Sequence, residues 1–346
     1  MNKNLMNNFI DQQPIIIEKV INDELTLSGK LTKEIKEIIF VGSGSSLHAS
    51  KMGKIYFEKY TNFKTSYFSP TEYLERFKDS KNKYLLVAIS QSGSSKTTLK
   101  SLELAKGSDN PTILISATND EYKKNLSDQF IDLFCPTETI GPKTVGVLAT
   151  FVRIVQLALK LSIKKNFITE AETQDVLSKV LIHVKKIPSV KKNIQEWIKE
   201  HKWWADLSYL TVTSDWNLFP VIEEGSLKLL ETLRKPVLPY KIEDFTHGPH
   251  RLITKDSFHI FVASTKNTDT SYKVRSYAKE YTDNILYLSA DESSDIFLDI
   301  NNKQLGNEII YLLVFQVLAN ELALLTGFNP DEQIHSEFFS FVGTKE

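Results

Sequence analysis

Short apolar runs alternate with longer helical patterns along this chain, and the alternation starts again in its second half. That order is typical of β-α-β units, in which the strands form a parallel sheet and the helices cover it. Strands are predicted in the first half at 37–41, 65–68, 84–89, 112–116 and 129–134. Strands are predicted in the second half at 209–213, 237–241, 259–263 and 285–288. The sequence therefore predicts an α/β fold with two mainly parallel sheets.

Helical patterns separate these strands and close each half. In the first half, helices are predicted to begin near Ser45, Pro70, Ser95 and Glu121. Long apolar helices, at 145–163 and 307–326, close the two halves. The charged stretch 170–202 keeps apolar residues at helical spacing and lacks Gly, Ser or Pro clusters, so we expect a connecting helix rather than a flexible linker.

The expected domains are a helical N-terminal segment (1–30), a first α/β domain (31–168), the connecting helix (169–202), a second α/β domain (203–330) and a C-terminal tail (331–346). The two halves share the order of strands and helices but no obvious residue identity. A diverged duplication is therefore an open interpretation.

Charge and cysteine content exclude several classes of protein. Lys and Arg number 42 and Asp and Glu number 43, so no basic excess favours binding to nucleic acid or to a membrane surface. The lone Cys135 cannot form an internal disulfide and suits a reducing compartment. We also expect no signal peptide in residues 1–13 and no membrane-spanning run of about 20 apolar residues. These features predict a cytoplasmic protein.

Two serine-rich loops follow predicted strands. Residues 41–46 read VGSGSS and residues 90–95 read SQSGSS, and a helix follows each loop. Hydroxyl groups and backbone N–H groups at a helix N-terminus, at the carboxyl end of a parallel strand, form a site that suits a phosphate group. The sequence therefore predicts a phosphate site made by both loops.

These loops allow other interpretations. Leu47 occupies the position where a dinucleotide-binding loop needs its third glycine, and no Lys follows the glycine as in a P-loop, so nucleotides are not favoured. Serine is also a preferred N-cap residue, so one such loop could equally do no more than cap its helix. The presence of two loops at neighbouring strand ends favours the phosphate site.

A predicted helix in the second half carries three charged residues on one stripe. Glu224, Lys228 and Glu231 share a face at 100° per residue, and His247 follows in the turn 246–249. These side chains together can move protons near neutral pH. The alternative is a solvated helix face with i,i+4 pairing. The surrounding residues are apolar, and we expect the N-terminal part of the helix at the ligand edge of the sheet, which favours a site.

Three motifs resemble a known family. SQSG at 90–93, EGSLKLLE at 224–231 and HGP at 247–249 resemble the isomerase half of glutamine–fructose-6-phosphate aminotransferase. They are also similar to other sugar isomerase (SIS) proteins, including fructoselysine-6-phosphate deglycases and one class of glucosamine-6-phosphate deaminases. The resemblance covers nearly the whole chain and implies two tandem SIS domains, each a mainly parallel sheet flanked by helices in a flavodoxin-like sandwich.

The resemblance implies a role for each matching residue. It implies phosphate contacts from Ser90, Gln91, Ser92 and Ser95, and contacts to phosphate or sugar hydroxyls from Ser45 and Ser46. Glu231 would be the base that moves a proton between C1 and C2, with Glu224 and Lys228 beside it. His247 would open the sugar ring and reach the site of a neighbouring subunit, which implies a homodimer with shared active sites.

Departures from the aminotransferase narrow the expected reaction. The chain shows no glutaminase domain, so we expect no release of ammonia from glutamine. The family forms a Schiff base through a tail lysine, but residues 335–340 (HSEFFS) contain none. A substrate that already carries its nitrogen needs no such lysine, which favours a deaminase or deglycase acting on an amino-sugar 6-phosphate. No metal or organic cofactor is expected, because no cluster of His, Cys and Asp has ligand spacing.

Two alternative functions stay open. One is an aldose–ketose phosphate isomerase that releases no amine. The other is a sugar-phosphate-binding regulator that performs no chemistry, although Glu231 and His247 argue against it because a sensor needs no base.

Overall fold

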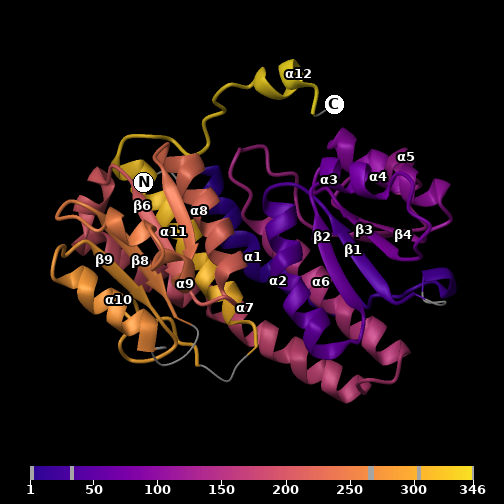
Figure 1. The fold of residues 1–346 in the computed structure, drawn as a ribbon, viewed down its shortest axis with the longest axis horizontal. Helices are drawn as coiled ribbons and strands as arrows, with labels where there is room; N and C mark the ends of the chain where they lie inside the picture. Colours follow the sequence, from indigo (N-terminus) through magenta and orange to yellow (C-terminus); the bar gives the residue numbers. More distant parts are fainter. Residues whose placement is uncertain (1–3, 32–34, 264–268, 302–304, 345–346) are drawn as a thin grey trace. The chain divides into compact units, whose positions relative to one another are not determined.

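The chain divides into two compact units, each built around one parallel sheet (Figure 1). The computed structural model describes residues 4–31, 35–263, 269–301 and 305–344. The first-sheet unit consists of Ile15–Thr139, Val145–Ser178 and Gln333–Glu346. The second-sheet unit consists of Met1–Pro14, Ile140–Thr144 and Lys179–Glu332.

The first sheet has the strand order β2-β1-β3-β4-β5, and all of its pairings are parallel. Its strands are β1 (Glu37–Val41), β2 (Lys64–Phe68), β3 (Leu85–Ile89), β4 (Thr112–Ser116) and β5 (Gln129–Asp132). Every residue of β3 and β4 is buried, as expected for central strands covered on both faces.

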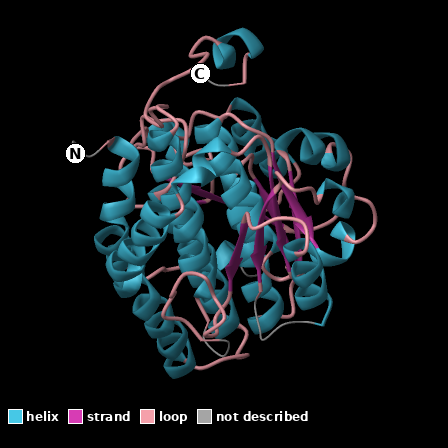
Figure 2. Ribbon diagram, turned by 90° about the vertical axis from the view of Figure 1, so that its left-hand side faces the viewer, coloured by secondary structure: helices cyan, strands magenta, loops and turns pink. Residues whose placement is uncertain are grey.

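Helices pack against the strands of this sheet. Figure 2 shows strands with helices around them. The helices are α2 (Ser45–Tyr60), α3 (Pro70–Phe77), α4 (Lys96–Gly107), α5 (Glu121–Lys124) and α6 (Val145–Lys164). Helix α2 packs against α6, where Phe57 of α2 also meets Phe40 of β1 with ring centroids 5.3 Å apart. Tyr73 of α3 and Leu102 of α4 belong to a buried cluster on alternate residues of the strands. Successive strand residues point to opposite faces of the sheet, so the side covered by α2 and α6 and the side covered by α3 and α4 have separate cores.

The second sheet has the order β7-β6-β8-β9 and is also entirely parallel. Its strands are β6 (Leu210–Ser214), β7 (Val237–Lys241), β8 (Phe258–Val262) and β9 (Ile285–Leu288). Its helices are α8 (Phe219–Leu233), α9 (Ile242–Phe245), α10 (Asp269–Lys279) and α11 (Asn307–Leu325). This order matches the first four strands of the first sheet, which confirms the predicted fold class of two parallel sheets flanked by helices.

The remaining elements are α1 (Leu5–Asn22), α7 (Glu170–Glu200) and α12 (Phe338–Val342), with short 3-10 helices at Gly29–Leu31, Lys202–Asp206 and Pro249–Leu252. Every strand predicted from the sequence is present, with ends within about two residues of the prediction. The sequence did not predict α10, whose residues are mostly polar and charged. The domain boundaries proposed from the sequence stay a prediction.

No apolar run long enough to span a membrane is expected from the sequence, and this expectation is wrong. Two helices, α6 and α11, are long and apolar enough to cross a membrane by length and composition alone. Most of α6 and of α11 is buried within the protein. Burial inside the protein therefore accounts for the apolar length of each helix.

A histidine is buried inside the second sheet. His259 of β8 has no exposed surface, and its two ring nitrogens lie 2.6 Å from Thr211 Oγ1 and 2.7 Å from Ser257 Oγ. Burial lowers the pKa of His259 to about 4 from its ordinary value of 6.5. The folded protein therefore holds this imidazole neutral at pH values at which the unfolded chain would protonate it.

We predict that His259 makes the protein less stable in mild acid. Between the folded-state pKa of about 4 and the ordinary value of 6.5, the unfolded chain binds more protons, so the free energy of unfolding falls as the pH drops through this window. The part of the free energy of unfolding that depends on neutral His259 is about 3 kcal/mol. It is fully present above pH 6.5 and is lost as the pH falls toward 4. Denaturant unfolding at pH 7 and pH 4.5 measures it.

The variant His259→Gln cannot titrate but can still hydrogen-bond to both hydroxyls. We expect its stability to fall less between these pH values than that of the wild type. An equal fall in both proteins would contradict the assignment.

Candidate functional site

The first serine-rich loop leads into α2 without a capping side chain. Gly44 is the N-cap residue, has φ of 53° and makes no side-chain hydrogen bond to the helix. A Cβ atom on Gly42 would lie 2.9 Å from Cβ of Ser46, so the loop approaches the start of α2 closely. Ser45 and Ser46 form the first turn of the helix and are partly exposed.

The second serine-rich loop leads into α4 in a similar way. Ser95 is the N-cap residue, but its hydroxyl accepts a hydrogen bond from Thr98 Oγ1 at 2.9 Å and caps no backbone N–H. The hydroxyls of Ser92 and Ser94 lie 2.7 Å apart. Gly93 has φ of 67°, and a Cβ there would lie 2.9 Å from Cβ of Thr118, so this turn requires glycine.

The two loops lie at the same edge of the first sheet. They follow β1 and β3, which are hydrogen-bonded parallel neighbours with Val41 opposite Ala88. The first N–H groups of a helix have no partner within the helix and carry its partial positive charge. The structure thus brings two such helix starts and several hydroxyls to adjacent strand ends.

Helix caps elsewhere in the same unit argue against the capping interpretation. Ser69 caps α3 by accepting from Glu72 N, and Asp120 caps α5 by accepting from Tyr122 N and Lys123 N. Side-chain caps of this kind are absent at α2 and α4. The serine-rich loops therefore do not act as ordinary N-caps.

The predicted phosphate ligands differ in their surroundings. Ser92 is exposed, Ser95 is partly exposed, and Ser90 is buried with its N–H donating to Ile115 O. The side chain of Gln91 is held inside the unit, where Nε2 donates to Glu138 Oε2 at 2.8 Å. No sequence pattern marks Glu138, because it lies in an irregular segment and belongs to none of the three motifs. We expect Gln91 to contact a ligand through its backbone.

The charged stripe of α8 forms a contiguous group in the second-sheet unit. The Nζ atom of Lys228 lies 2.7 Å from Glu231 Oε2 and 3.4 Å from Glu224 Oε1. The side chains of Lys228 and Glu224 are 1% and 0% exposed, whereas that of Glu231 is 30% exposed. Only the carboxylate of Glu231 among the three is thus accessible to a ligand, and the alternative of a solvated helix face is wrong.

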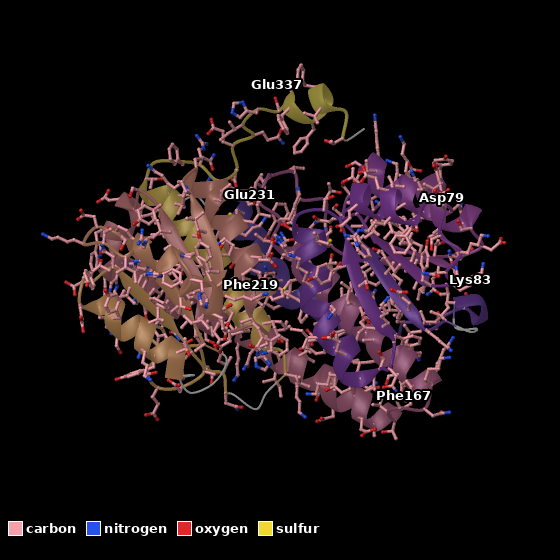
Figure 3. All side chains as sticks on the ribbon, in the orientation of Figure 1. Asp79, Lys83, Phe167, Phe219, Glu231 and Glu337 are labelled. Atoms are coloured by element: carbon pink, nitrogen blue, oxygen red, sulfur yellow. The ribbon has the colours of Figure 1, made fainter. Side chains whose placement is uncertain are left out.

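The expected position of this stripe needs a correction. Helix α8 begins at Phe219, so Glu231 lies in its last turn, about 18 Å along the axis from the first residue. Figure 3 labels Phe219 and Glu231 at opposite ends of the helix. The expectation that the N-terminal part of the helix carries the site is therefore wrong for Glu231.

His247 lies in an exposed turn after β7 and α9. Its backbone N–H donates to Asp244 O, and Gly248, with φ of 132°, follows it. Within the described residues, no hydrogen bond or ion pair joins the side chain of His247 to Glu224, Lys228 or Glu231. The structure brings the three α8 charges together but does not bring His247 to them.

Across residues 4–31, 35–263, 269–301 and 305–344, no group of three or more His, Cys, Asp or Glu side chains could hold a metal ion. The absence of a metal or organic cofactor stays a prediction from the sequence.

Comparison with known proteins finds similarities in sequence and in fold. The family model "SIS domain" matches residues 31–160. The chain is 27% identical to glutamine–fructose-6-phosphate aminotransferase [isomerizing] of Thermococcus kodakarensis, over 93% of this chain and 55% of that protein. The corresponding protein of Thermotoga maritima is 26% identical over 92% of this chain and 54% of that protein. This chain thus spans about half the length of the curated relatives that it matches.

Solved structures show the same fold. A Clostridium difficile 630 protein superposes with a TM-score of 0.89 at 22% identity, covering 100% of this chain and 99% of that one. The C-terminal domain of glucosamine-fructose-6-phosphate aminotransferase from Francisella tularensis has a TM-score of 0.80 at 22% identity, covering 96% and 98%. Glucosamine-6-phosphate deaminase from Thermotoga maritima has a TM-score of 0.79 at 19% identity, covering 96% and 98%.

We predict that Lys228→Met destabilises the protein by about 3 to 5 kcal/mol, because it removes the cation beside the buried carboxylate of Glu224. Adding Glu224→Gln should recover much of this loss, since the buried charge is then also removed. Lys192→Met is the matched control, because Lys192 pairs with Glu196 at i,i+4 on an exposed helix face. We expect the control to change stability by less than about 1 kcal/mol.

Denaturant unfolding of the three variants and the wild type measures these differences. An equal effect of Lys228→Met and Lys192→Met would show that the α8 pair is not a buried pair in solution.

Proposed function

We propose that this SIS-domain protein, which resembles the isomerase part of glutamine–fructose-6-phosphate aminotransferase, processes a phosphorylated sugar by moving a proton between C1 and C2. The observation that carries the proposal is the pair of helix starts, at α2 and α4, that follow adjacent strands and lack side-chain caps. Backbone N–H groups, serine hydroxyls and the helix dipoles together suit the dianion of a sugar 6-phosphate. Ser45, Ser46, Ser90, Ser92 and Ser95, with the backbone of Gln91, are its proposed ligands.

Glu231 is the proposed base. Its side chain is 30% exposed, and it accepts a hydrogen bond from the buried ammonium of Lys228. A carboxylate next to the substrate can take a proton from the carbon beside a carbonyl or imine, and a nearby cation can stabilise the negative charge that develops on oxygen. Glu224 keeps Lys228 in place from its other side. Positioned acid–base catalysis of this kind contributes on the order of 100-fold to 10,000-fold.

The proposed substrate already carries its nitrogen. Residues 335–340 contain no lysine that could form an imine with a ketose. We therefore favour an amino-sugar 6-phosphate, or its N-substituted derivative, and a reaction that isomerises the sugar and releases an amine. The name of the similar Thermotoga maritima structure, a glucosamine-6-phosphate deaminase, is in line with this class.

His247 is proposed to open the sugar ring. Its side chain is exposed, which leaves it accessible to a ligand or to another copy of the chain. A homodimer with shared active sites, located in the cytoplasm, is part of this proposal. Turnover without release of an amine would instead favour an aldose–ketose isomerase, and binding without turnover would favour a regulator.

We predict that Glu231→Gln abolishes turnover and leaves the affinity for the sugar phosphate within about tenfold. The amide keeps the shape of the side chain but cannot accept the proton, so the loss falls mainly on kcat. Release of ammonia from glucosamine 6-phosphate measures turnover, and calorimetric binding of the same compound measures affinity.

Glu223→Gln is the control on the same helix, one residue away from the stripe, and should retain most of the activity. If Glu231→Gln kept more than about a tenth of wild-type kcat, Glu231 would not be the base.

We predict that Ser92→Ala weakens the binding of glucosamine 6-phosphate by about 5-fold to 20-fold and changes the binding of glucosamine little. The exposed hydroxyl donates to the phosphate, and a hydrogen bond to a charged group contributes about 1.5 kcal/mol or more. Ser108→Ala, at the C-cap of α4, the helix that follows the loop of Ser92, is the control. Equal weakening of both compounds would remove Ser92 from the phosphate site.

A further inference from the structure

Glu138 is a buried carboxylate that lies behind the second serine-rich loop and that the proposed reaction does not use. It is 3% exposed. A single carboxylate oxygen, Oε2, accepts from Gln91 Nε2 at 2.8 Å and from the backbone N–H of Gly146 at 2.9 Å. Gln91 belongs to the loop, and Gly146 belongs to the first turn of α6. One side chain therefore connects the loop to the start of a buried helix.

The contacts of Gln91 leave its side chain little freedom. A Cβ atom on Gly146 would lie 1.9 Å from Gln91 Nε2, so the amide packs directly on the backbone of α6. On the other side, the carbonyl oxygen of Gln91 accepts from Ala117 N at 2.8 Å and from Ser116 Oγ at 3.2 Å. The backbone of the loop is thus fixed by β4, and its one long side chain is fixed by Glu138.

A role in capping α6 alone would not need this arrangement. An N-cap side chain normally comes from the residue directly before the helix, whereas Glu138 lies eight residues before Gly146 in sequence. It also shares its oxygen with Gln91. A carboxylate only accepts hydrogen bonds, so it draws the amide of Gln91 inward and away from the loop hydroxyls and N–H groups.

We propose that Glu138 is a positioning residue for phosphate binding, which acts through Gln91 to keep the loop 90–95 open for the anion. This inference rests on the proposed function. Without Glu138, the amide of Gln91 keeps only a weak acceptor, Cys135 Sγ at 3.8 Å. The side chain then no longer anchors the loop to α6, and the loop N–H groups and hydroxyls lose their fixed places around the phosphate. Glu138 itself contacts no substrate.

The test is calorimetric binding of inorganic phosphate, glucosamine 6-phosphate and glucosamine to the full chain. We expect Glu138→Ala to weaken both phosphate compounds roughly 10-fold, because a hydrogen bond to a charged group contributes about that factor or more. Glu138→Gln keeps one oxygen that can accept both N–H groups, so we expect binding within about threefold of wild type. The affinity for glucosamine should be the same in all three proteins.

Three further variants separate positioning from a general loss of stability. Asp128→Ala is the matched control, because the carboxylate of Asp128 also accepts two hydrogen bonds, from Thr112 N and Oγ1, at the start of β4. It should lower stability without changing phosphate affinity. Gln91→Ala should weaken phosphate binding, and adding Glu138→Ala should weaken it little more, since Glu138 acts through Gln91. If Glu138→Ala alone folds poorly, the comparison of Gln91→Ala with the double variant still tests whether Glu138 acts through Gln91.

Each outcome has a distinct meaning. Wild-type phosphate affinity in Glu138→Ala, a loss in Glu138→Gln as large as in Glu138→Ala, or fully additive effects with Gln91→Ala would each overturn the role of Glu138. A wild-type protein that binds neither phosphate compound would overturn the phosphate site itself, and the role of Glu138 with it.

Discussion

The parallel pairing of β1 with β3 determines where the proposed phosphate site can form. Because Val41 lies opposite Ala88 in this pair, the chain leaves both strands at the same level and enters α2 and α4 from neighbouring points. Parallel strands require helical crossovers, so each strand end is followed by a helix that starts at this edge. The positive ends of two helix dipoles thus converge without any charged side chain in either loop.

Local sequence keeps these helix starts accessible. Gly44 offers no side chain at the N-cap of α2, and the hydroxyl of Ser95 is used by Thr98 instead of the backbone. In the same unit, Ser69 and Asp120 cap α3 and α5 in the ordinary way. A missing N-cap side chain costs about 1 kcal/mol of stability. An anion bound at these two helix starts would supply the missing acceptors.

The sequence predicted the strands and most helices because these depend on local patterns of apolar residues, and the runs at β1 and β4 are short, apolar and bounded by turn residues. Contacts that depend on tertiary structure could not be predicted. The bond from Gln91 to Glu138 spans 47 residues of sequence, and no short-range pattern marks it. Helix α10 was missed because its composition is mostly polar, so few apolar residues mark it as part of the fold.

The spacing of Glu224, Lys228 and Glu231 predicted their contact but not their different exposure. Periodicity places three residues on one stripe, whereas burial depends on what packs against each turn of the helix. Gly225 lets Phe315 of α11 approach the middle of α8, where a Cβ atom would lie 2.2 Å from its ring, and this covers the turn that carries Glu224. The last turn of α8 extends beyond the buried pair, so Glu231 keeps one side open. The same stripe thus provides an internal ion pair and an accessible carboxylate held next to a cation, which is the combination that proton transfer beside a carbonyl requires.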